Sequence, residues 1–261
     1  MPNKFVGTHL ANELIARLGI ASGAQGIEII EAGLQQQRIL GAGTTGGTGE
    51  ETVWDAAGAF PWASLATAQA LEIVSSSAND TAAGTGARTV RIRGLSATYA
   101  EITEDVTLNG TTAVDLTLSY LRVFSIEVLT AGSGLVNAGT LTLRLDAAGA
   151  TVAAVTIGKN ISQSGVWTVP LNKQAYLMRW QATRPTTTNF AGGVYIRTFG
   201  GLFKPIAYEQ FTGAGKIGSL YPLALFLPEK ADIDFRVTTA ASTTAVTAEA
   251  DIIVEQIRAS S

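Results

Sequence analysis

The sequence contains no cysteine and only one histidine, and these two shortages exclude several kinds of chemistry. Without thiols the chain can build neither a disulfide framework nor a thiolate metal site. The single histidine, His9, has no second imidazole or thiol with which to form a catalytic dyad or a zinc site. We interpret His9 as an ordinary surface residue, and we predict that the protein uses neither a cofactor nor a metal ion.

Clustered charge and long apolar runs are also scarce. The 261 residues include 18 basic and 21 acidic side chains, a net charge of −3, spread without long runs of one sign. No stretch combines clustered Lys or Arg with interleaved aromatic residues, so we expect no nucleic-acid partner. The longest apolar run, residues 223–227, is far shorter than the roughly 20 residues that span a bilayer. Lys4 is not followed by the apolar core of a signal peptide, so we expect neither a membrane partner nor a cleaved leader.

The first 50 residues differ from the rest in composition. Apolar residues at helical spacing, with Thr8 as N-cap and Gly19 as stop, predict one short helix. These apolar residues are Leu10, Leu14, Ile15 and Leu18. Residues 27–30 fit either a helix or a strand, and the glycine-rich residues 41–49 predict a flexible or extended connector. We therefore expect residues 1–50 to form an N-terminal arm and connector outside the core.

From residue 51 onward, apolar and polar residues alternate with a period of two, which is typical of half-buried β-strands. Turn signals such as Asn109-Gly110, at which we predict a hairpin, separate the strands. Residues 51–261 are therefore predicted to form an all-β domain, an antiparallel β-sandwich of jelly-roll-like type, with room for an inserted or added smaller β subdomain. The predicted strands are residues 71–74, 90–95, 104–108, 114–118, 123–129, 141–145, 152–157, 166–169, 176–181, 194–199, 233–238 and 246–254.

Three acidic clusters are the candidates for catalysis by paired carboxylates, because glycoside hydrolysis needs only two. They are Glu50, Glu51 and Asp55; Glu101, Glu104 and Asp105; and Asp232 with Asp234. The last two alternate across Ile233, so they share the face opposite the core, and we interpret them as solvent-facing. Exposed carboxylates keep ordinary pKa values, and we therefore predict that the protein is not an enzyme. A calcium site near Asn79-Asp80 or the Glu101 cluster is an alternative use of these oxygens.

An aromatic cluster follows the glycine-rich connector and contains Trp54, Phe60 and Trp62. Such residues anchor cores, and they are also enriched at subunit interfaces. Either role buries them in an assembly. Together with Leu10, Leu14 and Leu18 of the arm, they are our candidate contacts with other copies of the chain or with a coat protein.

One part of the chain resembles a segment found in uncharacterised structural proteins of tailed bacteriophages. The similar stretch runs from residue 51 to about residue 133 and covers about a third of the chain. It includes residues 51–55 (ETVWD), 74–90 (VSSSANDTAAGTGARTV) and 107–112 (TLNGTT). The resemblance carries no catalytic motif, so no functional residue is transferred from it.

The resemblance implies a virion structural protein, made in the host cytoplasm and located on the particle, most specifically on the exterior of the head. A capsid decoration or cement protein fits best, a homotrimer that bridges subunits of the major capsid protein and binds other copies of itself. The alternative is a tail, neck or fibre component that binds a host surface glycan. That reading favours exposed aromatic residues, whereas Trp167, Trp180 and Tyr195 fall in predicted strands. A glycan-processing enzyme that uses the acidic clusters is the third hypothesis.

Overall fold

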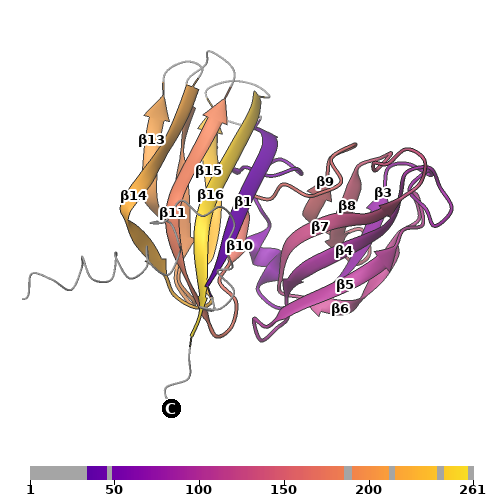
Figure 1. The fold of residues 1–261 in the computed structure, drawn as a ribbon, viewed down its shortest axis with the longest axis horizontal. Coiled ribbons are helices and arrows are strands. Elements are labelled where there is room, and N and C mark those ends of the chain that lie inside the picture. The colour runs from indigo at the N-terminus through magenta and orange to yellow at the C-terminus, as the bar shows by residue number, and fades with distance from the viewer. Residues whose placement is uncertain (1–33, 46–48, 185–189, 212–214, 240–243, 258–261) are drawn as a thin grey trace, which may run out of the picture.

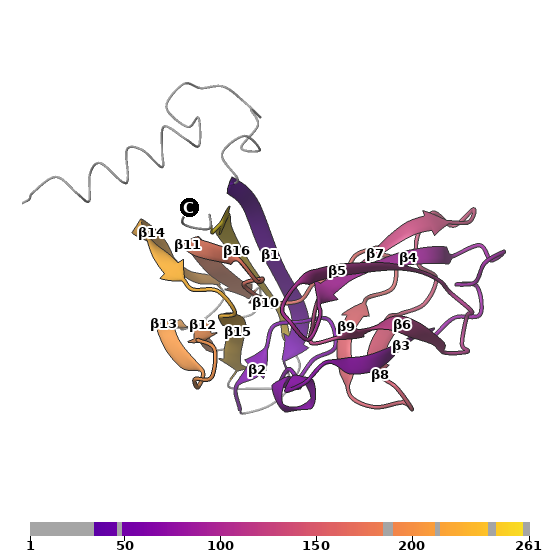
Figure 2. The ribbon, with the colours of Figure 1, turned by 90° about the horizontal axis from the view of Figure 1, so that it is seen from below.

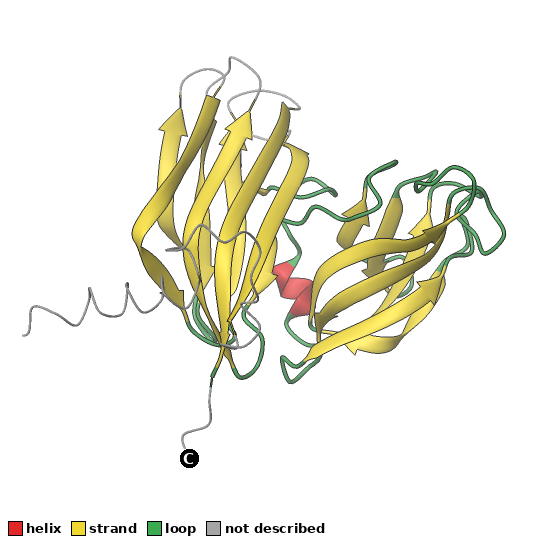
Figure 3. Cartoon of the chain, viewed as in Figure 1, coloured by secondary structure: helices red, strands yellow, loops and turns green. Residues whose placement is uncertain are grey.

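The computed structural model describes residues 34–45, 49–184, 190–211, 215–239 and 244–257. The chain is all-β, and its strand pairs are antiparallel, which confirms this part of the predicted fold class. Within the described residues one helix is present, the short 3-10 helix η3 (Trp62–Leu65), which lies between two groups of strands (Figure 3). No helix in these ranges is long and apolar enough to cross a bilayer.

The strands form two lobes (Figure 1), of which the larger contains both ends of the described chain. One of its sheets has the order β1-β16-β11-β14, and the other has the order β10-β15-β12-β13 with β2 also beside β15. Its strands are β1 (Leu34–Thr45), β2 (Glu51–Thr52), β10 (Val166–Thr168), β11 (Lys173–Arg184), β12 (Phe190–Arg197), β13 (Lys204–Phe211), β14 (Gly215–Leu227), β15 (Asp232–Thr239) and β16 (Thr244–Gln256).

The two sheets of the larger lobe pack on each other and share one hydrophobic core, as the two layers in Figure 2 show. Leu177 of β11 and Ile252 of β16 come from one sheet, and Val194 of β12 and Phe235 of β15 come from the other. Every second residue of these strands is apolar, and the pleat turns those residues to the same side. Burial of this apolar face is the main force that holds the two sheets together.

The smaller lobe is inserted into the larger one, because the chain enters it after β2 and returns at β10. Its sheets have the orders β6-β3-β8-β9 and β5-β4-β7, and they share a second core that includes Ile73, Leu143, Ile92 and Ile126. The strands are β3 (Gln69–Ser75), β4 (Ala87–Leu95), β5 (Glu101–Thr107), β6 (Val114–Tyr120), β7 (Arg122–Ala131), β8 (Leu141–Leu145) and β9 (Thr151–Val155).

Two expectations about this region differ from the structure. Residues 51–261 do not form one sandwich, since four separate sheets are present, and the two cores group these sheets in pairs, one pair in each lobe. The hairpin predicted at Asn109-Gly110 is wrong. Gly110 does adopt a positive φ of 62°, but the connection carries the chain from β5 in one sheet to β6 in the other.

The glycine-rich stretch also differs from its predicted role as a connector. Its first part belongs to β1, which pairs with β16 in an unbroken register over the whole length of the strand. Gly41 and Gly43 lie where the chain at Val53 and Trp54 crosses β1, and a Cβ at Gly43 would lie 2.0 Å from the carbonyl oxygen of Trp54. Glycine is therefore required here for close backbone approach rather than for flexibility.

We predict that Gly43→Ala destabilises the protein by about 1–3 kcal/mol, because the added methyl group displaces the crossing backbone. Gly49→Ala is the matched control, since a Cβ at Gly49 has no heavy atom within 4 Å. Urea unfolding of the two variants measures the difference. Equal unfolding midpoints would show that β1 and the crossing segment are not in tight contact.

Candidate functional site: the junction of the two lobes

Two backbone segments connect the lobes, and they lie side by side. The amide of Gly165 donates to the carbonyl of Val53 (2.9 Å), and the amide of Asp55 donates to the carbonyl of Gln163 (3.2 Å). The amide of Gln163 in turn donates to the carboxylate of Asp55 (2.6 Å). The amide of Val53 also donates to the carbonyl of Phe235 of β15, and the amide of Phe235 donates to the carbonyl of Gly165. The connection is thus an extension of the sheet and not a loose linker, which restricts hinge motion between the lobes.

The outer face of β15 forms the centre of the junction. Ile233, Phe235 and Val237 point into the core of the larger lobe, so Asp232 and Asp234 share the opposite face, as their spacing predicted. The interpretation that they face solvent is wrong, since they are only 3% and 1% exposed. The smaller lobe covers this face, and an alternating pattern contains no information about what covers the polar side of a strand.

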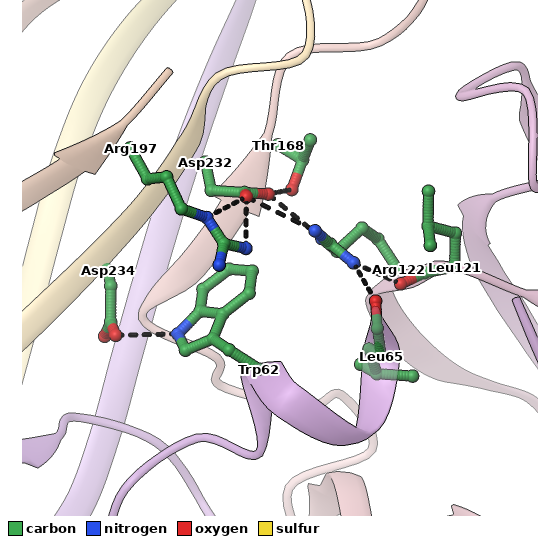
Figure 4. A network of polar contacts seen from close by, with 8 residues as sticks. All are labelled: Trp62, Leu65, Leu121, Arg122, Thr168, Arg197, Asp232 and Asp234. Atoms are coloured by element: carbon green, nitrogen blue, oxygen red, sulfur yellow. Dashed lines mark hydrogen bonds and ion pairs between the residues drawn. The ribbon is translucent and has the colours of Figure 1, made fainter. Parts of the chain in front are cut away.

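Asp232 receives hydrogen bonds from both lobes (Figure 4). Arg122 of β7 in the smaller lobe donates through Nε at 3.0 Å, and Arg197 of β12 donates through Nε at 2.8 Å. The hydroxyl of Thr168 donates at 2.6 Å. Arg122 also donates from Nη1 to the carbonyls of Leu65 and Leu121, both at 2.7 Å. The charge pair is therefore buried and surrounded by further hydrogen bonds, the condition under which a buried ion pair is tolerated.

Asp234 forms the second half of the network. Trp62 of η3 donates from its indole nitrogen to Asp234 at 2.8 Å (Figure 4), Thr52 donates at 3.0 Å and Arg236 donates at 2.8 Å. Burial raises the pKa of Asp234, against the opposing effects of Arg236 and of the hydrogen bonds from Trp62 and Thr52. The guanidinium carbons of Arg122 and Arg197 lie 5.1 and 5.0 Å from the centre of the Trp62 ring, within the range of cation–π attraction.

This arrangement fixes the lobes to each other. Each carboxylate has several donors, and apart from Arg236, which lies on β15 itself, every donor comes from another element of the fold. Such contacts orient β15, η3 and β7, and a carboxylate engaged in this way has little freedom to accept a proton from a substrate. We interpret the junction as a structural lock.

The other predicted carboxylates each have a separate partner. Glu101 pairs with Lys173 at 2.6 Å, Asp105 pairs with Arg91 at 2.7 Å, and Glu104 accepts hydrogen bonds from the amide and hydroxyl of Thr117. Of the first cluster, Glu50 accepts from Tyr195, and Asp55 ties the two connecting segments together. Burial raises the pKa of Asp55. These side chains serve packing and pairing at separate places in the fold.

The structure argues against a calcium ion at Asp80. This carboxylate is fully buried and accepts hydrogen bonds from the amides of Ala87 (2.7 Å), Ala138 (2.8 Å) and Gly139 (2.8 Å) and from the hydroxyl of Ser75 (2.6 Å). Four donors occupy the acceptor sites of one carboxylate, which leaves none for a cation. Asp80 instead organises the loop between β3 and β4.

A different acidic group lies on the sheet β6-β3-β8-β9 of the smaller lobe. Ligand oxygens of Glu72, Asp115 and Asp146 lie within 4.8 Å of one another, which is close enough for a shared cation. Glu72, however, already pairs with Arg144 at 2.5 Å and accepts the amide of Ala148 at 3.1 Å. The positive charge near this group is therefore supplied by an arginine of the chain itself.

The predicted contact residues have different locations. Trp54 and Phe60 are 3% and 5% exposed and pack against each other in the core of the smaller lobe, with ring centres 5.1 Å apart. Little of either ring remains for contact with another subunit. Trp62 is half-buried at the junction. Leu10, Leu14 and Leu18 lie outside the described residues, so contact through them stays a prediction.

A groove of about 910 Å³ lies between the lobes. Residues 35–40 of β1 form one wall, and Arg93, Thr103 and Ser125, which are neighbours across the outer face of the sheet β5-β4-β7, form the other. Phe124 and Trp167, whose ring centres are 5.9 Å apart, contribute aromatic surface to the lining. The groove is therefore part apolar and part polar, and one of its walls is a β-strand.

No family model matches the chain, and no curated protein matches its sequence. Three solved structures that align with it are titled "Structure of infectious bursal disease virus Gt strain", "Structure of infectious bursal disease virus Gx strain" and "Crystal structure of infectious bursal disease virus VP2 subviral particle". Their sequence identities to this chain are 11%, 12% and 12%. The alignments cover 92%, 85% and 94% of this chain and 77%, 70% and 77% of those chains, with TM-scores of 0.20, 0.24 and 0.20. TM-scores this low mean that the molecules do not superpose as wholes, so no common fold follows.

We predict that Asp232→Asn lowers the free energy of unfolding by about 3–5 kcal/mol, because it leaves Arg122 buried without its counter-charge. Asp105→Asn is the control. It removes the ion pair between Asp105 and Arg91, whose N–O distance of 2.7 Å is close to that of the Asp232 pair. Because the Asp105 side chain is 49% exposed, we expect little change in stability. Denaturant unfolding of both variants, followed by tryptophan fluorescence, gives the comparison. Similar midpoints for the two variants would contradict the lock.

Proposed function

We propose that this chain is a non-enzymatic structural protein of a tailed-bacteriophage particle, and most specifically a decoration or cement protein on the exterior of the head. In this role it bridges subunits of the major capsid protein and contacts other copies of itself, with a homotrimer as the favoured state. The observation that carries the proposal is the strand order of the larger lobe.

Eight strands of the larger lobe, β1 and β10 to β16, can be numbered 1 to 8 along the chain. One sheet then has the order 1-8-3-6 and the other 2-7-4-5. These are the strand orders of a jelly roll, in which eight antiparallel strands form two Greek keys across two sheets. β2 and β10 pair with successive parts of β15, as one continuous strand would. The smaller lobe is therefore inserted within a single strand of the larger lobe. This order supports a jelly roll with an inserted lobe, and jelly rolls are frequent in viral shells.

The segment that resembles phage structural proteins, residues 51 to about 133, includes strands β2 to β7 and therefore most of the smaller lobe. Its polar residues have structural roles, as Asp80 shows. Gly86 of the same segment has no room for a side chain, because a Cβ would lie 2.1 Å from Asp80 Oδ1. The quoted residues thus specify a loop conformation, which agrees with a resemblance in architecture rather than in chemistry.

The non-enzymatic part of the proposal is supported by the carboxylates. The acidic residues that could serve as an acid and base pair are engaged with arginine, lysine or backbone donors. Among the described residues, the large groove is lined by Glu101 and Glu127, and both form ion pairs, with Lys173 and Arg93.

A tail, neck or fibre component that binds a host glycan is the alternative. Trp167, Trp180 and Tyr195 are between 1% and 6% exposed, so they cannot stack on a sugar. The observation that favours this reading is Phe199, which is 66% exposed beside Tyr99 and Lys230. An aromatic pair next to a donor is a surface on which a sugar ring can stack.

We predict that particles of the virus encoding this chain contain it in numbers that match the sites of the coat lattice. Quantitative mass spectrometry of purified particles gives the number, and electron microscopy gives the position. Density for two β lobes over the head would support the decoration role. A few copies at the tail would favour the glycan-binding alternative, and absence from the particle would overturn both.

A further inference from the structure

The first half of β1 is a free edge that is able to accept another strand. β1 is the terminal strand of its sheet, and its only described strand partner is β16. The second half of its edge is covered where the chain at Val53 and Trp54 crosses Gly41 and Gly43. Residues 34–40 remain, about 23 Å of strand at roughly 3.3 Å per residue.

This edge lacks the features that normally protect an open strand from pairing. Proteins cover such edges or protect them with proline, lysine or a β-bulge. Residues 34–40 (LQQQRIL) contain neither proline nor lysine, and their register with β16 has no bulge. Their one charged residue, Arg38, pairs with Asp251 of β16 at 3.0 Å. The side chains of Gln35, Gln36 and Gln37 are exposed. The open edge can therefore pair with any extended chain that reaches it.

The groove provides the space for such a chain. Its volume of about 910 Å³ adjoins the free part of β1, and Phe124 and Ile102, which are partly exposed, supply apolar surface for alternate side chains of an added strand. Ser125 and Arg93 on the opposite wall supply polar groups. Because the lock at Asp232 fixes the lobes, the groove exists before any partner arrives, which lowers the entropy cost of binding.

We propose that the groove binds residues 26–31 (GIEIIE) from a neighbouring copy of this chain, which add a strand to β1. This segment has three isoleucines, the β-branched type most favoured in strands, and Ile27 and Ile29 fall on the same side of a strand. It ends three residues before Leu34 and belongs to 33 residues that precede the described chain. The inference rests on the structural role proposed above and names the partner of one site.

We take a neighbour as the source because exchange between copies joins them into an assembly, as the proposed structural role requires, and pairing with the chain's own β1 is the other outcome that the test separates. Around a symmetry axis the same segment enters the next copy's groove, so each copy gives one strand and accepts one. Strand exchange of this kind joins copies through main-chain hydrogen bonds, with specificity from the side chains that alternate into the groove. Many such contacts around a shell add to strong binding.

Disulfide trapping on the purified chain tests the exchange, and the absence of native cysteine makes it clean. One protein carries Ile29→Cys in the segment and the other carries Ser125→Cys in the groove wall, with a purification tag on one of them. After mixing and oxidation, we expect a disulfide-linked dimer that contains one chain of each kind. Ile29→Cys mixed with Thr111→Cys is the control, because Thr111 is exposed and does not line the groove; we expect loss of the mixed dimer there.

A chain that carries both Ile29→Cys and Ser125→Cys separates the remaining outcomes. If the bond forms only within single chains, the segment folds back on its own β1 and the neighbour exchange is wrong. If no bond forms, or if the Thr111→Cys control links equally well, the groove does not bind this segment. The assay uses the purified chain and no virus particle, so a negative trapping result does not contradict the virion role. Likewise, absence of the chain from virus particles does not contradict a positive trapping result.

Discussion

The molecule depends on one buried charge, the carboxylate of Asp232, which neither lobe alone supplies with enough donors. Arg197 and Thr168 approach it from the larger lobe and Arg122 approaches it from the smaller one. Taking these charges out of water is costly, and the cost is offset only when every donor and acceptor is in place. The lobes are therefore held in one orientation, because a partial separation would break the hydrogen bonds before water could replace them.

That fixed orientation determines the rest of the surface. The groove has one wall from each lobe, so its width is set by the junction and not by either lobe alone. The two connecting segments reinforce this, since Val53 and Gly165 bond to Phe235 and continue the sheet into the linker. Hydrogen-bonded strands transmit force between the lobes better than a flexible linker does, which suits the shell role that we propose.

The sequence predicts the strands whose outer faces are polar and whose interiors are uninterrupted. Every predicted strand overlaps a strand of the structure. Most of these strands are half-buried and alternate apolar with polar residues, whereas β9 and β10 are buried on both faces and were predicted from short apolar runs. β13 and β14 escaped prediction because Pro205 and Pro222 interrupt them. Both are edge strands, where a proline removes no ladder hydrogen bond, and Pro205 stands beside a register shift. β1 escaped because its glycines suggested a connector, whereas they serve close backbone approach.

The junction was only half predictable. Spacing places Asp232 and Asp234 on one face, but the cover over that face comes from residues more than a hundred positions away. The sequence could have indicated that Arg122 is buried and paired, since it lies between Leu121 and Val123 in an apolar stretch. A charged side chain in such a setting is rarely buried without a partner. Its partner could not be named, because the pairing depends on how the inserted lobe turns back on β15.

The same crossing that forced glycine into β1 also limits what β1 can bind. The chain at Val53 and Trp54 lies against Gly41 and Gly43, so an added strand that starts near residue 34 must stop before this point. The free length of edge, residues 34–40, then accommodates a segment of about the size of GIEIIE and excludes a longer continuous strand. The insertion of the smaller lobe thus has two effects on one strand, since it covers half of the edge and supplies the opposite wall of the groove over the other half.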